Sequence, residues 1–243
     1  MKERNKLILD EILRLYIKTG NPVSSRMIAK SQDISLSPAS IRNIMADLEE
    51  SGYVHQPHTS AGRIPTKEAL KIYASHIIHE KNKNKTFQGT NLFPTFSDYD
   101  DMIEYISTSL SEQTGQSSFV IFPKEKKQYN TTKLFLGSFS NLLKQPEFES
   151  VEKIKKIFTV FEKKEHLLKK FNNLGKGLHV HIGEDNQISG LEDCALVSSS
   201  YEGFPAHGFI GIIGPTRMNY SEVIEAVRST AHTLTKKMGN HYV

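Results

Sequence analysis

Apolar residues repeat at helical spacing in two segments near the start of the chain. In the first segment they fall at i, i+4, i+7 and i+8, on one face of a helix that Gly20 and Pro22 then end. In the second segment they fall at i, i+3, i+4 and i+7. The pattern predicts two helices, and their buried faces are Ile8, Ile12, Leu15 and Tyr16 in one and Ile41, Ile44, Met45 and Leu48 in the other.

Polar residues mark where two short helices begin. Ser24 is placed to cap a helix that includes Ile28. Ser37 is placed to cap the next helix, and Pro38 suits its first position because the missing N–H is not needed there. Gly52 marks the end of that helix. We therefore expect two helices joined by a turn.

The exposed face of the later helix has the composition of a base-reading surface. Opposite the buried stripe lie Arg42 and Asn43, between Ala39 and Ala46. Small residues let a helix approach the floor of the groove, while Arg matches guanine and Asn matches adenine with two hydrogen bonds each. Any one of these residues is equally typical of a solvated helix face. Their combination with the preceding helix and turn favours DNA reading.

After Gly52 the pattern changes to a short strand and a loop. Tyr53 and Val54 begin the strand, and HQPHTSAGR has the Pro, Gly and small polar residues of a tight loop. Arg63 is the only cation of this loop, and we expect it at the tip of a wing. There it would enter the minor groove, contact a phosphate or only aid solubility, and the sequence leaves these roles open. Thr66 is placed to cap a fourth helix, whose core face is Leu70, Tyr73, Ala74 and Ile77.

Residues 21–66 thus have the layout of a winged helix-turn-helix that binds duplex DNA. We assign residues 1–78 to this DNA-binding domain. The candidate DNA-binding residues are Ser37, Ala39, Ser40, Arg42, Asn43, Ala46, His58, Ser60 and Arg63.

The remaining chain is expected to hold a linker and a second domain. Residues 79–90, HEKNKNKTFQGT, are polar and cationic and predict the linker. In residues 91–243 strand-like runs cover 117–123, 133–139, 178–183, 194–201 and 208–214. They mix with helices without regular alternation, which predicts an α+β fold. The expected helix faces are Met102, Ile106 and Leu110, then Val151, Ile154, Ile157, Phe158 and Phe161, and last Val223, Val227, Ala231 and Leu234.

Four separated motifs resemble the HrcA family of bacterial heat-inducible transcription repressors. They are PVSSRMIAK, LSPASIRNIMADLEESGYVHQPHTSAGRIPT, NLLKQPEF and GFIGIIGPTRMNYSEVI, in that order. The resemblance implies a GAF-like mixed α/β second domain and a homodimer that binds the CIRCE inverted repeat upstream of chaperone operons. It also implies repression that responds to heat and depends on the GroEL chaperonin to hold the active state.

One region departs from the family pattern. In the family the GAF-like domain carries an inserted segment that contributes to dimerisation. Here fewer than about 20 residues separate VIFP from NLLKQPEF, too few for an additional globular segment. We expect the insertion to be shortened or absent. A two-fold dimer is still expected, because an inverted repeat presents two related half-sites.

The composition of the chain excludes few classes of fold or function. With 243 residues and 37% hydrophobic content, the chain is able to form two cored domains. A net charge of +4 is weak evidence for a nucleic-acid partner. A single cysteine excludes an intrachain disulfide. The charged N-terminus lacks the apolar run of a signal peptide. We therefore expect a cytoplasmic protein without a membrane span. Cations that precede the reading helix and suit phosphates are Lys2, Arg4, Lys6, Arg14, Lys18, Arg26 and Lys30.

Three other places carry candidate chemistry. His179 and His181 share one side of a strand, where Glu184, Asp185 or His207 would complete a metal shell, but a polar strand face is favoured. Cys194 begins an apolar strand and has no motif of a nucleophile. Arg217, in GPTRM, suits an anion or a structural tie to neighbouring carbonyls, and the tie is favoured because no Gly-rich phosphate loop accompanies it.

Three functions remain under consideration. The leading hypothesis is a DNA-binding repressor whose second domain supplies dimerisation and a heat- or chaperonin-responsive state. The second keeps the DNA-binding domain and makes the second domain a sensor of a metabolite or a metal. The third is an enzyme, which is disfavoured because the sequence has no nucleophile, metal or phosphate motif. We expect no cofactor.

Overall fold

The computed structural model describes residues 1–32, 34–83, 94, 96, 98–122, 133–163, 165–203 and 207–239. The chain divides into two compact units, Met1–Glu80 and Lys81–Val243. Helix α4 (Lys67–Lys83) continues into the segment expected to be a linker, because its exposed polar residues are compatible with a helix. Residues 84–90 of that segment and the polar residues 124–132 lie outside the described ones.

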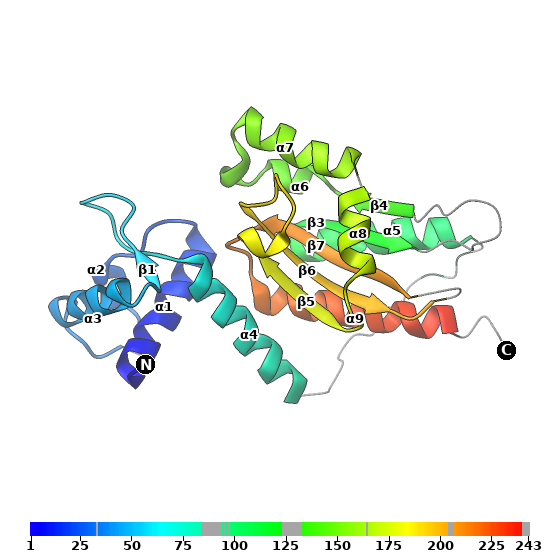
Figure 1. Cartoon of the computed structure of the whole chain (residues 1–243). Helices are drawn as coiled ribbons and strands as arrows, with labels where there is room; N and C mark the ends of the chain where they lie inside the picture. Colours follow the sequence, from blue (N-terminus) through cyan, green and yellow to red (C-terminus); the bar gives the residue numbers. More distant parts are fainter. Residues whose placement is uncertain are drawn as a thin grey trace. The chain divides into compact units, whose positions relative to one another are not determined.

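The N-terminal unit contains the expected helices and a small hairpin (Figure 1). Ser24 caps the second helix by accepting a hydrogen bond from Met27 N, and Ser37 caps the third, which has Pro at its start. Thr66 Oγ1 accepts from Ala69 N and so caps α4, as expected. The elements are α1 (Glu3–Thr19), α2 (Ser25–Ile28), α3 (Pro38–Glu50), β1 (Val54–His55), β2 (Ile64–Pro65) and α4.

Helix α1 buries a face that differs in part from the expected one. Ile8 and Ile12 are fully buried, as predicted. Leu15 and Tyr16 are only half-buried, and Leu9 and Leu13 take the core positions instead. The reason is that α1 packs against both α3 and β2, so its buried face is wider and is turned toward those two leucines. The expected core faces of α3 and α4 are buried except at Ile44 and Tyr73, which are half-buried.

The C-terminal unit is built on a five-stranded antiparallel sheet with the strand order β4-β3-β7-β6-β5. All five strand-like runs of the sequence lie in this sheet, which confirms a mixed fold with separate helices and an antiparallel sheet. Strand β7 is the central strand, and it pairs with β3 on one side and with β6 on the other. All residues of β7 are buried. The strands are β3 (Ser117–Phe122), β4 (Lys133–Gly137), β5 (Leu178–Ile182), β6 (Cys194–Tyr201) and β7 (Gly208–Pro215).

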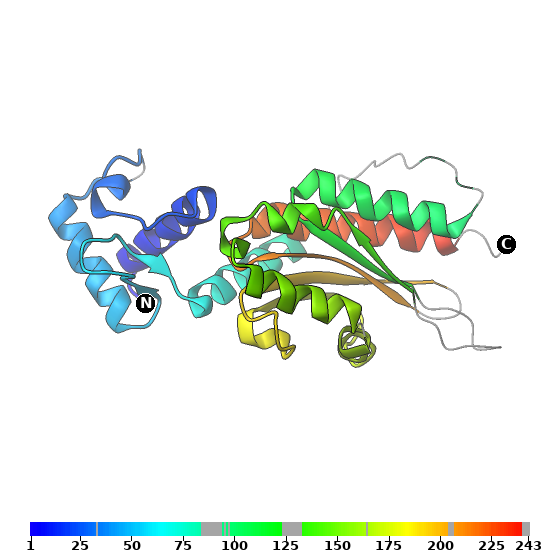
Figure 2. The same cartoon turned by 90° about the horizontal axis from the view of Figure 1, so that it is seen from above.

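Helices cover both faces of the sheet (Figure 2). Helices α5 (Tyr99–Thr114) and α9 (Tyr220–Gly239) pack on one face and against each other. The expected buried stripes of both helices are confirmed. The other face is covered by α6 (Ser140–Leu143), η1 (Pro146–Phe148), α7 (Val151–Glu162), α8 (Glu165–Asn172) and η2 (Gly183–Asn186).

The side chains beneath α7 and α8 form the larger aromatic core. Alternate residues of the strands point into it, as the two-residue period of a strand requires. Phe171 of α8 packs in tilted geometry against Phe119 and Phe209, with ring centroids 5.1 and 5.3 Å away. The expected stripe of α7 is wrong at two positions, because Val151 is 66% and Phe158 is 43% exposed. Only one narrow side of α7 faces the sheet, and Val160 occupies it instead.

Candidate nucleic-acid interface

Helix α3 begins with the cap that its sequence predicts. Ser37 Oγ accepts from Ser40 N at 3.1 Å, and the two hydroxyls lie 3.0 Å apart. Pro38 occupies the first turn, where no backbone donor is needed. Burial of Ile41, Met45 and Leu48 then fixes which side of the helix faces the solvent.

The opposite side of α3 is exposed along its whole length. We call Ala39, Arg42, Asn43 and Ala46 the reading face, and all four are exposed. Within the described part of the chain, neither Arg42 nor Asn43 has a hydrogen bond or ion pair that holds its polar end. Their donors and acceptors are therefore available to a partner, and the other two residues of the reading face are small.

The hairpin follows α3 directly and is short. Val54 pairs with Pro65 and His55 with Ile64 in antiparallel register. The loop between the strands is closed by a turn in which Ala61 N donates to His58 O at 2.8 Å. His58 and Ser60 are both exposed in this loop. These two candidates thus lie at the outer end of the hairpin.

Glu49 at the end of α3 fixes the base of the hairpin. Its Oε1 accepts from Gln56 N at 2.8 Å. The Gln56 amide in turn donates to Thr59 O at 2.8 Å and to Ala61 O at 3.0 Å, which closes the loop from inside. Glu49 and Gln56 were not among the candidates, and no pattern in the sequence distinguishes them from other polar residues.

Arg63 does not lie at the tip of the hairpin, so that expectation was wrong. It lies at the base, where its Nη2 is 2.8 Å from Glu49 Oε2 and only 17% of its side chain is exposed. Its backbone exchanges two 2.8 Å hydrogen bonds with Val23. These bonds need Gly62, because a Cβ there would lie 2.3 Å from Val23 O. The bridge to Val23 pulls the second strand inward, and Arg63 is left facing α3.

A hollow of about 450 Å³ lies between α2, α3 and the hairpin. Arg26, Arg42 and Arg63 line it from three different elements, together with the hydroxyls of Ser24 and Ser60. Guanidinium groups around one concave surface attract anions, and phosphates are their commonest partners in nucleic acids. Arg26 was noted only as one of several cations before α3. Nothing in the sequence indicated that it lies beside Arg42.

Comparison with known proteins identifies relatives of the entire chain. A protein from Carboxydothermus hydrogenoformans is 27% identical over 98% of this chain and 98% of its own length. One from Halalkalibacterium halodurans is 29% identical over 100% of this chain and 99% of its own. Both are named heat-inducible transcription repressor HrcA. The family model for the HrcA protein C terminal domain matches residues 125–224.

The chain is similar to HrcA proteins along its whole length, and its C-terminal unit matches the HrcA family model. The resemblance of the four motifs to HrcA is thereby confirmed. A solved structure described as that of a hypothetical protein at 2.2 Å resolution has a TM-score of 0.84 and 19% identity, with 99% of each chain covered. It supports the fold alone. The alignment with the C. hydrogenoformans HrcA has 335 positions against the 243 residues of this chain, so at least 92 (335 minus 243) have no counterpart here.

Two of the HrcA motifs meet in the C-terminal unit. Arg217 of GPTRM forms a two-bonded ion pair with Glu147 of NLLKQPEF, through Nε to Oε1 and through Nη2 to Oε2 at 3.2 Å. The side chains are 15% and 27% exposed. The structural tie expected of Arg217 is confirmed, although its partner is a carboxylate and not a carbonyl. The pair joins the turn before α9 to η1.

The remaining candidate residues of the sequence are the two histidines of β5 and Cys194 of β6. No group of three His, Cys, Asp or Glu residues that would hold a metal ion occurs in the described parts of the chain. His179 and His181 do share one side of β5, and His179 Nε2 contacts Gly175 O at 2.7 Å. Cys194 is fully buried, and burial raises the pKa of its thiol to about 12, which excludes a reactive thiolate near neutral pH. Among the described helices none is long and apolar enough to span a bilayer.

Proposed function

We propose that this HrcA-like chain is a heat-inducible transcriptional repressor that binds duplex DNA through a winged helix-turn-helix. In this proposal α2 and α3 form the helix-turn-helix and the β1–β2 hairpin is the wing. The observation that carries the proposal is the reading face, where Arg42 and Asn43 are exposed between two alanines and have no partner among the residues that the structure describes. The names of the full-length relatives support the same role.

The residues around α3 divide by the contact that each would make. Arg42 and Asn43 have the side chains that recognise guanine and adenine edges in the major groove. Ser37 and Ser40 lie at the first turn of α3, where backbone N–H groups and hydroxyls suit a phosphate. His58 and Ser60 on the wing loop, and Arg26 in the hollow, would contact the backbone of the flanking DNA. Arg63 would act through Glu49, by holding the wing in place.

The operator in this proposal is the CIRCE inverted repeat of chaperone operons, and the chain binds it as a homodimer. An inverted repeat presents the same base edges twice, so two copies of the reading face satisfy it with two-fold symmetry. The GAF-like C-terminal unit would supply the dimer contacts, without the inserted segment of longer relatives. Sedimentation of the free protein and of its complex with a single repeat tests this stoichiometry.

Heat would act on the folded state of the dimer. Domains of this size are stabilised by only about 5 to 15 kcal/mol, so a few degrees are enough to change the folded fraction of a marginal dimer. In the proposal GroEL restores that fraction, and a shortage of chaperonin empties the operator. Operator binding that is unchanged through a heat-shock temperature, with no effect of GroEL, contradicts this part.

The deciding experiment is binding of the full chain to two labelled duplexes at near-physiological salt, measured by fluorescence anisotropy with and without GroEL. One duplex carries the inverted repeat and the other a scrambled version. The proposal expects preference for the repeat by several powers of ten, since specific sites exceed random DNA by about 10³ to 10⁷. Equal and salt-sensitive binding to both duplexes would reject sequence-specific repression.

Two arginine variants sharpen the measurement. Arg42→Ala is expected to weaken the repeat complex and to leave the scrambled complex nearly unchanged, because a base contact is lost. Arg26→Ala removes the same charge from the neighbouring helix and is expected to weaken both complexes to a similar extent, as for a phosphate contact. If the two variants behave alike, Arg42 does not read a base.

A further inference from the structure

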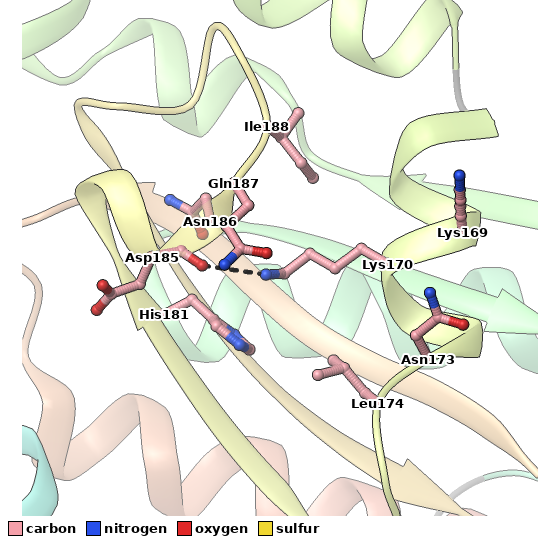
Figure 3. Close-up of a pocket in the computed structure, with 9 residues that line it drawn as sticks. All are labelled: Lys169, Lys170, Asn173, Leu174, His181, Asp185, Asn186, Gln187 and Ile188. Carbon is pink, nitrogen blue, oxygen red and sulfur yellow. Dashed lines mark hydrogen bonds between the residues drawn. The ribbon is translucent and has the colours of Figure 1, made fainter.

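We infer that the cleft between α8 and the β5–η2 corner of the C-terminal unit binds a small organic anion with a carboxylate or phosphate group. The cleft has a volume of about 620 Å³, within the range of small-molecule sites. Its key residues are Lys170 from α8, His181 from β5, and Asn186 and Ile188 from the η2 corner (Figure 3). The inference is independent of DNA binding.

Two buried polar atoms in this cleft have no partner among the described residues. His181 Nδ1 is buried and makes no hydrogen bond, and neither does Asn186 Oδ1. Asn186 is fully buried, and its Nδ2 is already held by Leu191 O and Cys194 O, both at 2.9 Å. Buried polar groups in native proteins are nearly always satisfied, so the two unsatisfied atoms indicate a missing partner. His181 Nδ1 is able to donate to an anionic oxygen, whereas Asn186 Oδ1 only accepts and needs a donor such as a hydroxyl of the ligand or a water molecule.

Lys170 supplies the charge that selects an anion. Its ammonium reaches across the cleft and donates to Asp185 O at 3.2 Å, which uses one of its three N–H groups. Figure 3 shows that the carboxylate of Asp185 points to the opposite side, away from this ammonium. The cleft is thus lined by a cation that uses one of its three donors on a backbone carbonyl.

His181 complements this cation as a neutral donor. Burial, and next the positive charge of Lys170, lower the pKa of its imidazole to about 4, so it is uncharged at neutral pH. A neutral imidazole carries one N–H, and with the proton on Nδ1 it donates to an anionic oxygen. Leu174 and Ile188 provide apolar contacts for the carbon part of the ligand. The set therefore suits an organic anion better than a bare cation or a metal.

The inference is tested on the full-length protein without DNA. Inorganic phosphate, succinate and citrate are titrated while the imidazole nitrogens of His181 are followed by NMR, with glycerol as the neutral probe. A saturable shift with at least one anion and none with glycerol is expected. Because the anion adds negative charge, the pKa of His181 should rise in its presence. No saturable shift with any of the three anions would overturn the inference.

Two lysine variants separate a built site from general charge attraction. Lys170→Gln is expected to weaken the best anion at least tenfold. Lys169→Gln is the matched control, because it removes the same charge from the same helix while Figure 3 shows its side chain directed away from the cleft centre. Equal weakening by both variants would overturn the inference. Loss of phosphate binding with retention of citrate, or the reverse, identifies which of the two anionic groups the cleft takes.

Discussion

The reading face of α3 and the cleft beside α8 present polar groups in opposite ways. On the reading face Arg42 and Asn43 are exposed, and water solvates them when no partner is bound. In the cleft His181 Nδ1 and Asn186 Oδ1 are buried and have no partner within the described part of the chain. An exposed free group has no energetic cost, whereas a buried unsatisfied group costs about 1 to 3 kcal/mol.

This difference determines how each surface is tested. Substitutions on an exposed face change binding and leave the stability of the fold nearly unchanged. Substitutions in a buried polar cleft change stability as well, since each side chain is also part of the packing. An exposed helix face suits a macromolecule such as duplex DNA, and an enclosed site with few polar groups suits a small molecule.

The largest effect is expected from the double variant Arg42→Ala, Asn43→Ala. If both side chains read bases, operator binding should weaken by about 2 to 6 kcal/mol, since each base contact contributes about 1 to 3 kcal/mol. Thermal unfolding should change by less than about 0.5 kcal/mol, because both residues are exposed. Anisotropy and calorimetry on the same preparation check this. A comparable loss in both measurements would mean that the reading face belongs to the folded core.

Substitution of a buried residue in the cleft should instead lower the stability of the fold. Asn186→Ala removes the donor to Leu191 O and Cys194 O, and Leu191 O keeps only its bond from Cys194 N, so the variant should destabilise the C-terminal unit by about 1 to 3 kcal/mol. Asn173→Ala, at an exposed position of the same cleft, is the control and should cost less than about 0.5 kcal/mol. Urea unfolding measures both. Similar small costs would remove the contrast between the two surfaces.

The sequence predicted features that depend on neighbouring residues better than features that depend on residues far apart in the chain. The caps Ser37 and Thr66 and the exposure of Arg42 depend on neighbours within one turn of helix, and all were predicted correctly. The strands of the C-terminal unit were predicted from their apolar runs. The cleft was not predicted, because Lys170 and His181 come from separate elements that only the fold brings together.

Arg63 shows the same limit inside the better-predicted unit. Its loop composition predicted a tip residue, but two long-range contacts, Val23 to its backbone and Glu49 to its side chain, hold it at the base. A similar pairing explains Arg217, whose partner Glu147 lies 70 positions away in the sequence. Local patterns therefore predicted the elements, and ion pairs across elements had to be observed.

A smaller effect is expected from Arg63→Met, which tests its position at the base of the wing. Losing the pair with Glu49 should cost about 1 kcal/mol of stability, a value kept low because Glu49 is partly exposed. DNA binding should weaken equally on the operator and on a scrambled duplex. Glu49→Gln is the control, since its amide oxygen still accepts from Gln56 N. A selective loss on the operator would instead assign Arg63 to the minor groove.

The last expected effect concerns acid and the His181 imidazole. The folded state holds its pKa at about 4, while in the unfolded chain it is near 6.5. Between these values the unfolded chain binds the extra proton, so this group lowers stability progressively as pH falls from about 6.5 to about 4. His181→Gln should therefore make stability less dependent on pH in that window, and His207→Gln should not. A bound anion should oppose the acid effect by stabilising the imidazolium, so a wild-type slope that phosphate, succinate and citrate all leave unchanged would argue against the cleft as an anion site.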